Sequence, residues 1–488
     1  MARWTFPIQL DHGAGTPLFR QIASAVVEDI RRGRLRPADL VPGTRTLART
    51  LGVSRQTVVA ALDELKAEGW LETAPTRGTF VARDLPDAQP LRSRAPSRTG
   101  IPERPAFAVP DAPPGALPYD VPPGGLLLAP NRPDTRLIPS RLIGRAYGRA
   151  LRQSGPILLG YGRPHGHQPL RAAVAGMLSA ARGLVVSADD VCITRGSQMA
   201  IALLARTLVR PGDIVAVEEL CHQPAVNAFR VQGAEIAPVP LDESGLRVDA
   251  LERLVRERGI RALYLTPHHQ FPTTVTLSAA RRLQLLELAR TRRFAIVEED
   301  YDHEFHYEGR PVLPLASLDR DGVVAYVGTF SKVLAPGLRI GYLAAPRSLV
   351  DAAAAHRLHL DVQGDRVMEH ALAELIEAGE VQRHVRRVHR EYAARRDVLV
   401  EALRRSLGSA LTFAVPGGGI ALWVKAAEGI DIDRWAERAK TRGLVFETAR
   451  SYAVDRRARP YARLGFASLA RRELLEAVRR LAAARPRS

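Results

Sequence analysis

The chain of 488 residues is 46% hydrophobic and 25% charged, a composition typical of a soluble globular protein with two or three domains. No apolar run is long enough for a membrane span and the N-terminal stretch has no apolar signal core, so neither a membrane protein nor a secreted protein is expected. Two cysteines, Cys192 and Cys221, are too few for a disulfide framework, which favours the cytoplasm. The net charge of +18 favours a nucleic-acid partner, although residues 1–85 carry a surplus of only 3 positive charges.

The first 85 residues show the pattern of a winged helix-turn-helix domain. Apolar residues recur every four positions over 17–34, which predicts an amphipathic helix. Two further helices are predicted over 44–51 and 55–68, joined by a glycine turn, with Ser54 as the N-cap of the second. A short hairpin over 70–81 then forms the wing. This organisation predicts a domain that binds double-stranded DNA.

In a helix-turn-helix, the start of the second helix of the pair enters the major groove. Arg55 and Gln56 stand there, and their side chains can pair bidentately with guanine and adenine. Arginines on the preceding helix are expected to reach phosphates. The predicted DNA-contacting residues are Arg45, Arg49, Ser54, Arg55, Gln56, Thr57, Arg77 and Gly78.

Residues 86–123 are predicted to be a linker. They contain eleven prolines and few large apolar side chains, so they cannot form a core and are expected to be extended and semi-rigid.

Residues 124–488 alternate between helical patterns and short apolar runs, as at 214–217, 262–265 and 295–297. Such alternation predicts a three-layer α/β domain. The fold class is therefore multidomain, with a mainly helical N-terminal domain and a large α/β domain whose smaller subdomain spans roughly 370–488.

One lysine stands out in the large domain. The chain has 70 Lys and Arg residues, but only Lys66, Lys332, Lys425 and Lys440 are lysines. Arginine does not readily deprotonate and cannot form an imine, whereas lysine can. Lys332 lies in Gly328-Thr329-Phe330-Ser331-Lys332, followed by Arg339, so hydroxyls and a guanidinium accompany the amine. This set predicts a site for an aldehyde that bears a phosphate.

The string 328–342 resembles the lysine motif of fold-type I aminotransferases, which bind pyridoxal phosphate. Together with "LGVSRQTVVAALDELKAEGWLE" in the N-terminal domain, which is similar to the GntR winged helix, it resembles the MocR family of transcription regulators. The resemblance spans nearly the whole chain, although the loop 37–43 departs from the GntR pattern. It implies a homodimer with pyridoxal 5'-phosphate as cofactor.

The resemblance also assigns roles. Lys332 forms the Schiff base, Tyr301 meets the ring oxygen, and Tyr161 reaches the cofactor phosphate of the partner subunit. Arg463, in a segment similar to the family's Arg-x-x-Phe, clamps the carboxylate of an effector. The residues implied to hold the phosphate are Gly196, Ser197, Gln198, Thr329, Ser331 and Arg339.

Three positions depart from the family's pattern. His222 replaces the aromatic residue that lies on the pyridine ring, and Phe271 replaces the asparagine that holds the ring hydroxyl. The third departure concerns the carboxylate that pairs with the pyridine nitrogen, which is either Glu299 or Asp300. Residues two apart in a strand share a face, which favours Glu299 because Tyr301 is implied to face the ring. These changes are expected to weaken turnover more than binding.

Two functions are compatible with these residues. The first is a regulator in which an amine or amino acid displaces Lys332 to form an external aldimine and thereby changes DNA binding. The alternative is a working aminotransferase that carries a DNA-binding domain. A scaffold without cofactor is disfavoured by the intact lysine motif. The sequence predicts no metal site.

Overall fold

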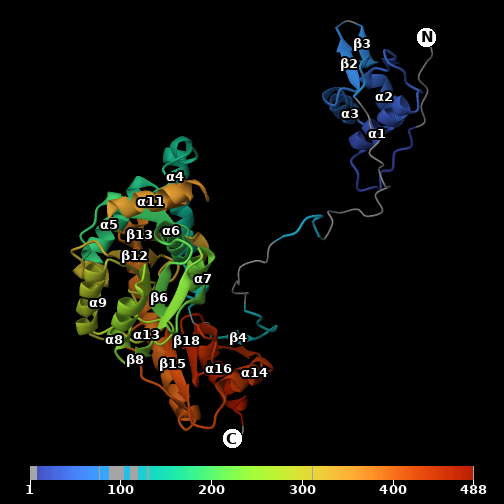
Figure 1. Cartoon of the computed structure of the whole chain (residues 1–488). Coiled ribbons are helices and arrows are strands. Elements are labelled where there is room, and N and C mark those ends of the chain that lie inside the picture. The colour runs from blue at the N-terminus through green and yellow to red at the C-terminus, as the bar shows by residue number, and fades with distance from the viewer. Residues whose placement is uncertain are drawn as a thin grey trace. The chain divides into compact units, whose positions relative to one another are not determined.

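The computed structural model describes residues 8–75, 77–86, 104–109, 119–128, 131–309 and 312–486. The chain divides into two compact units, Met1–Asp111 and Ala112–Ser488 (Figure 1). Most of the predicted linker lies outside the described residues.

The N-terminal unit is a small helical domain with a three-stranded sheet. Its helices are α1 (Leu18–Arg31), α2 (Thr44–Leu51) and α3 (Arg55–Ala67), and its strands are β1 (Leu40–Val41), β2 (Leu71–Ala74) and β3 (Gly78–Val81). The sheet has the order β1-β3-β2, with both pairs antiparallel. The helix predicted over 17–34 ends at Arg31, and β1 arises in the loop that departs from the GntR pattern. The third strand was not predicted, because two residues are too few to show a periodicity.

The apolar positions that predicted these helices form one core. Ile22 and Val26 of α1 pack with Val58 and Leu62 of α3, and Trp70 closes the cluster before the hairpin. Because one face of each helix is buried in this core, most charged side chains lie on the faces turned to solvent.

The large unit is built on a seven-stranded sheet of order β5-β13-β12-β11-β10-β6-β7, in which only β13 runs antiparallel to its neighbours. The strands are β5 (Val191–Thr194), β6 (Ile214–Glu218), β7 (Glu235–Val239), β10 (Ala262–Leu265), β11 (Ala295–Asp300), β12 (Val324–Thr329) and β13 (Gly341–Ala344). The parallel strands end at one edge, where α/β sheets bind ligands. A short hairpin, β8 (Leu241–Asp242) with β9 (Gly245–Leu246), lies outside this sheet.

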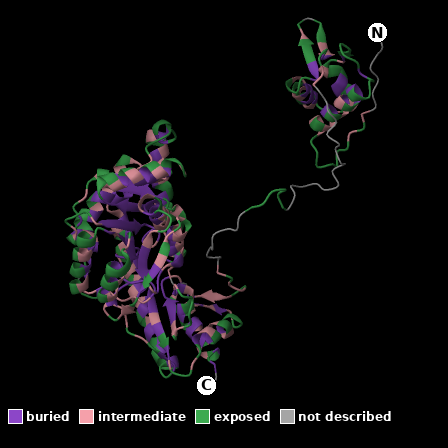
Figure 2. Ribbon diagram, in the orientation of Figure 1, coloured by how far each residue is buried: buried purple, intermediate pink, exposed green. Residues whose placement is uncertain are grey.

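Helices cover both faces of the sheet, so that the strands are buried between them (Figure 2). One face packs on α6 (Ser197–Leu208), α7 (Gln223–Val231) and α11 (Arg347–Leu358). The other packs on α4 (Ser140–Leu158), α5 (Gln168–Arg182), α8 (Val248–Arg258), α9 (Ala279–Arg292), α10 (Leu315–Leu318) and α12 (Arg366–Glu377). The predicted three-layer α/β fold is confirmed.

The small subdomain follows the long helix α13 (Glu380–Leu407). It contains an antiparallel sheet of order β14-β15-β18-β17, with β14 (Leu411–Thr412), β15 (Ala421–Ala426), β17 (Glu447–Thr448) and β18 (Tyr461–Gly465). Its helices are α14 (Ile432–Lys440), α15 (Ala449–Tyr452) and α16 (Arg471–Ala483), and β16 (Leu444–Val445) pairs with β4 (Leu126–Leu127) from the start of the unit.

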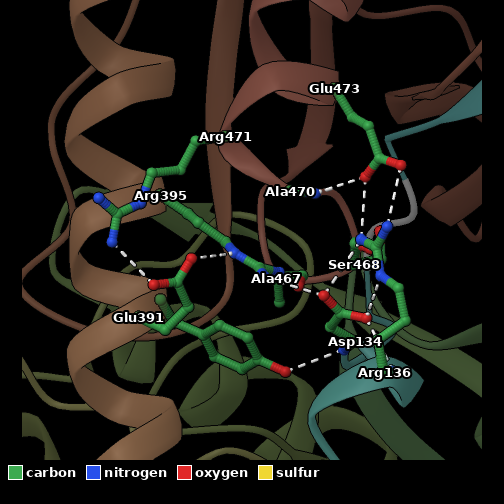
Figure 3. A network of polar contacts seen from close by, with 10 residues as sticks. Asp134, Arg136, Glu391, Arg395, Ala467, Ser468, Ala470, Arg471 and Glu473 are labelled. Atoms are coloured by element: carbon green, nitrogen blue, oxygen red, sulfur yellow. Dashed lines mark hydrogen bonds and ion pairs between the residues drawn. The ribbon is translucent and has the colours of Figure 1, made fainter.

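A polar network connects the first part of the large unit, at Asp134 and Arg136, to α13 and the small subdomain (Figure 3). The Asp134 carboxylate accepts hydrogen bonds from Arg136 at 2.8 Å and from Arg395 of α13 at 2.9 Å. Arg136 also pairs with Glu473 of α16 at 2.9 Å. Because Asp134 and Arg395 are almost fully buried, this charge pair is stabilising only while both partners are present.

Candidate functional site

A cavity of about 280 Å³ lies at the carboxyl ends of the parallel strands of the large unit. Four of its walls were predicted from the sequence: the lysine string, the turn that opens α6, the end of β11 and the segment near His222. The residues that line it are Tyr119, Asn131, Arg132, Ser197, Gln198, His222, Thr266, Phe271, Glu299, Tyr301, Thr329, Ser331, Lys332, Pro336 and Arg339.

Lys332 enters the cavity from the segment that follows β12. Its Nζ donates a hydrogen bond to the backbone oxygen of Asn131 at 2.6 Å. Burial lowers the pKa of the Lys332 amine to about 8, against the attraction of Glu299. A buried amine that loses its proton near neutral pH is a nucleophile for a carbonyl group.

The neighbouring wall is suited to an anion. Gly196 is the N-cap of α6 with φ +77°, so the free N–H groups of Ser197 and Gln198 open toward the cavity end. A Cβ on Gly196 would lie 2.9 Å from the Arg339 guanidinium, and only glycine permits this approach. Opposite the helix start, the Thr329 hydroxyl donates to Ser331 at 3.0 Å.

The end of β11 provides the carboxylate. Glu299 faces the cavity, and its Oε2 accepts a hydrogen bond from the Tyr264 hydroxyl at 2.6 Å. Asp300 points to the other face of the sheet, where its Oδ2 accepts from the Tyr326 hydroxyl at 2.7 Å and lies 3.0 Å from His303 Nδ1. The alternation of the strand therefore places Glu299 in the cavity and Asp300 outside its lining.

Aromatic rings form the wall near His222. The His222 ring meets Phe271 edge-on, with ring centroids 5.5 Å apart and an interplanar angle of 84°. Burial lowers the pKa of His222, so the imidazole is neutral at physiological pH. The Tyr301 hydroxyl donates to the backbone oxygen of His269 at 3.0 Å, and burial raises the pKa of this phenol.

Arg463 and Tyr161 do not line the cavity. Arg463 of β18 is completely buried behind the aromatic wall, with its guanidinium carbon 4.7 Å from the Phe271 ring centroid and its Nη2 3.3 Å from the Tyr301 hydroxyl. Tyr161 is 90% exposed. The predicted role of Arg463 at an effector carboxylate and that of Tyr161 at the cofactor phosphate of the partner subunit both stay predictions.

Five lining residues were not singled out by the sequence analysis: Tyr119, Asn131, Arg132, Thr266 and Pro336. Tyr119 comes from the end of the predicted linker, and the Arg132 guanidinium carbon lies 5.0 Å from its ring centroid. Asn131 accepts the hydrogen bond from Lys332 with its backbone oxygen, which no side-chain pattern reveals. An aromatic residue within a proline-rich stretch was the one available signal for Tyr119.

In the N-terminal unit, the predicted DNA-contacting residues gather at the α2–α3 turn and the hairpin. Ser54 caps α3, accepting from the Thr57 amide at 3.1 Å, and Arg55 donates to the Thr44 hydroxyl at 3.3 Å. Exposed side chains there are Arg45, Arg49, Ser54, Arg55, Gln56 and Arg77. Gly78 has φ +117°, and a Cβ there would lie 2.9 Å from the Leu40 side chain, so the glycine permits the packing of β1 on the hairpin.

Comparisons with known proteins match both units. Residues 18–81 match the gntR family of bacterial regulatory proteins, and residues 130–481 match the family of class I and II aminotransferases. The probable rhizopine catabolism regulatory protein MocR of Rhizobium meliloti is 32% identical over 97% of this chain and 95% of its own length. The chain belongs to the MocR-type regulators.

A second regulator, the pyridoxine biosynthesis transcriptional regulator PdxR of Corynebacterium glutamicum, is 32% identical over 81% of each chain. Among solved structures, kynurenine aminotransferase of Pyrococcus horikoshii has a TM-score of 0.70 at 30% identity, covering 74% of this chain and 90% of its own. The aminotransferase LysN of Thermus thermophilus, complexed with N-(5'-phosphopyridoxyl)-L-leucine, has a TM-score of 0.69 at 30% identity, covering 74% and 92%. The predicted family and fold class are confirmed, and the chain is a DNA-binding regulator of the pyridoxal-phosphate-dependent type.

The cavity fits the cofactor that this fold implies. It holds one buried amine, a helix N-terminus with an arginine beside it, and a carboxylate on the far wall: Lys332, the start of α6 with Arg339, and Glu299. An aldehyde, a phosphate and a pyridine nitrogen need these three partners. Of the described part of the chain, no helix is both long and apolar enough to cross a membrane.

Proposed function

We propose that this MocR-type regulator holds pyridoxal 5'-phosphate on Lys332 and senses an amine or amino acid that competes with this lysine for the cofactor, and that the exchange alters binding to an operator. The observation that carries the proposal is the Lys332 amine, buried in one cavity with an anion-binding helix start and the Glu299 carboxylate. When bound, the cofactor supplies an aldehyde that combines reversibly with primary amines and a ring that accepts electrons.

The protein side chains have separate tasks. Ser197, Thr329, Ser331 and Arg339, which line one end of the cavity, would bind the phosphate, and Glu299 would pair with a protonated ring nitrogen. The Tyr264 hydroxyl keeps the Glu299 carboxylate in place from the side away from the cavity. A cofactor held by these residues would offer its aldehyde to the Lys332 amine, and an incoming amine would compete with Lys332 for it.

An amino-acid effector also brings a carboxylate. Arg132 in the wall and Arg463 behind it are two guanidinium groups that stabilise a negative charge at this end of the cavity. The active form is a homodimer in which Tyr161 of one subunit reaches the cofactor phosphate of the other. The 90% exposure of Tyr161 in the single chain supports this role.

The alternative function, a working aminotransferase, is supported by the same lysine. An amine with a pKa of about 8 is a suitable base for the proton transfers of transamination. Release of a keto acid from candidate amino acids, measured at several turnovers per chain, would favour this alternative over a pure sensor.

The experiment compares the full chain with its Lys332→Ala and Lys425→Ala variants. Each protein is incubated with pyridoxal phosphate, reduced with borohydride and analysed by peptide mass spectrometry. Lys425 is the matched control because it is an exposed lysine on β15, outside the cavity. We expect a reduced cofactor adduct on Lys332 in the wild type and in Lys425→Ala, and none at that site in Lys332→Ala.

DNA binding is tested with duplexes that are selected from a pool of random sequences for binding to the full chain. Their affinity is measured with and without a panel of amines and amino acids in the three proteins. Lys332→Ala is expected to retain DNA binding and to lose the response to the active amine. An equal response in Lys332→Ala would contradict the proposed sensing mechanism, and recovery of no duplex would contradict the DNA-binding role.

A further inference from the structure

Four histidines gather behind the cavity wall in the large unit. His268 and His269 follow β10, and His303 and His306 follow β11, so the parallel sheet brings two adjacent loops together. One potential ligand atom from each of His268, His269 and His306 lies within 4.8 Å of the others. Three imidazole nitrogens this close can reach one ion at about 2.0–2.1 Å after small ring rotations.

His268 carries the clearest sign of a missing ligand. The residue is only 2% exposed, yet neither of its ring nitrogens has a hydrogen-bond partner among the described residues. A buried polar group without a partner destabilises the fold, so proteins rarely keep one without a reason. Stacking on His303, with ring centroids 4.6 Å apart, accounts for the packing of the ring but satisfies neither nitrogen.

The neighbouring rings are oriented in a way that suits a metal. Asp302 Oδ1 lies 2.8 Å from His269 Nδ1, which leaves the Nε2 of this ring available. A carboxylate behind a histidine is the usual arrangement that fixes the tautomer and orientation of a metal ligand. Both ring nitrogens of His306 are likewise buried and have no hydrogen-bond partner among the described residues.

We propose that His268, His269 and His306 bind a divalent ion of the zinc, nickel and copper class. Neutral imidazoles are the preferred ligands of these ions, whereas magnesium and calcium require oxygen ligands. Three protein ligands leave a fourth position for water or another small ligand. This set was not anticipated from the sequence, in which no metal site was predicted.

The metal site adjoins the cofactor cavity but is distinct from it. None of the three histidines lines the cavity, so the proposal stands without the proposed function. The two are linked through one hydrogen bond, because the Tyr301 hydroxyl in the cavity wall donates to the backbone oxygen of His269. An ion on His269 would hold this loop, and with it the position of the phenol, in one arrangement.

The test measures zinc and cobalt on the full chain. The protein as purified is analysed for metal content, then dialysed against a chelator and titrated with Zn²⁺ or Co²⁺ in the presence of pyridoxal phosphate and in its absence. Tetrahedral Co²⁺ is followed by its visible absorption. The variants are His306→Gln, which removes one half-buried ligand, and His359→Gln as the control, because His359 is exposed at the end of α11.

We expect one ion per chain in the wild type and in His359→Gln, with at least tenfold weaker binding in His306→Gln. Asp302→Asn keeps all three ligands and is expected to weaken binding by about 10–100-fold. It provides an independent test in case His306→Gln fails to fold. Equal binding in His306→Gln and the wild type, or no ion retained by either, overturns the proposal. An ion that binds only with pyridoxal phosphate present also overturns it, because the cofactor itself would then be the ligand.

Discussion

The two units of this protein place their functional side chains in opposite environments. In the N-terminal unit, Arg45, Arg49, Arg55 and Gln56 are exposed on a core that contains almost only apolar residues. In the large unit, Lys332 is half-buried and Glu299 is buried, and the Glu299 carboxylate is held by the buried hydroxyl of Tyr264. A surface for DNA needs long side chains that reach a groove, whereas a cofactor site needs groups whose positions and charges are fixed beforehand.

This difference has an energetic side. Exposed arginines cost little to keep, so they can be exchanged with little effect on folding. Buried charges are stable only as complete networks, and loss of one member leaves the others uncompensated. Substitutions should therefore separate: those of the exposed arginines in the N-terminal unit change function alone, and those of the buried charges in the large unit change stability, cofactor binding or both.

The largest effect is expected for Asp300→Ala. The substitution leaves the Tyr326 hydroxyl and His303 without their acceptor, and it removes a carboxylate 3.9 Å from the buried Arg182. We expect a loss of about 3 kcal/mol in the free energy of unfolding, measured in urea. A loss below about 1 kcal/mol would show that the buried network contributes little.

Glu299→Gln is the matched change on the other face of the same strand. The amide oxygen still accepts the hydrogen bond from Tyr264, so the stability is expected to stay within about 1 kcal/mol of the wild type. The loss of the negative charge at the ring nitrogen should instead weaken retention of pyridoxal phosphate, by about tenfold, and shift its absorption band. Unchanged retention and an unchanged band would contradict the assignment of Glu299 to the ring.

Arg55→Ala tests the exposed side chains that are predicted to contact DNA. The affinity for selected operator DNA should fall by about 1–3 kcal/mol, while the melting temperature and cofactor spectrum stay unchanged. Arg32→Ala is the control, because Arg32 is an exposed arginine at the end of α1 that pairs with Glu28. An equal loss in both variants would mean that general charge, and not the start of α3, governs binding.

The pH dependence of cofactor capture tests the burial of Lys332. Only the unprotonated amine reacts, and its fraction rises about tenfold per pH unit below the pKa and levels off above it. Since burial lowers this pKa to about 8, the rate of capture should rise up to about pH 8 and then reach a plateau. A rate that still climbs toward pH 10 would indicate a lysine in contact with water.

The smallest effect is expected at the N-cap of α3. Ser54→Ala removes the hydrogen bond accepted from the Thr57 amide and should destabilise the N-terminal unit by about 1 kcal/mol. Hydrogen exchange of α3, followed by mass spectrometry in the full chain, measures this locally. Ser54→Asn retains a capping oxygen and should exchange like the wild type; equally fast exchange in both variants would assign the effect to something other than the cap.

The sequence is informative where chemistry is local. The scarcity of lysine singles out Lys332, and the alternation of side chains along a strand favours Glu299 over Asp300 as the residue that faces the cavity. The glycine turn and cap of the helix-turn-helix likewise lie within a few residues of one another. Such features depend on neighbouring residues, so a linear pattern contains them.

Features that depend on distant segments were not predictable. Tyr119 reaches the cavity from a stretch that was predicted to be a linker, and its ring lies beside the Arg132 guanidinium. Arg463 is predicted to meet an effector, and its complete burial behind Phe271 depends on the packing of β18, which no local pattern contains. The histidine cluster joins two loops that only the pairing of β10 with β11 brings together.

The close approach of Gly196 and Gly341 has a consequence for engineering the response to new effectors. A Cβ on Gly341 would lie 2.6 Å from the Gly196 carbonyl carbon, so the floor of the anion-binding end is made of main chain and admits no larger residue. Selection for altered ligands can act there only at the price of the fold. Libraries are better directed to Tyr119 and Arg132, which line the same cavity and whose replacement meets no such limit from the main chain.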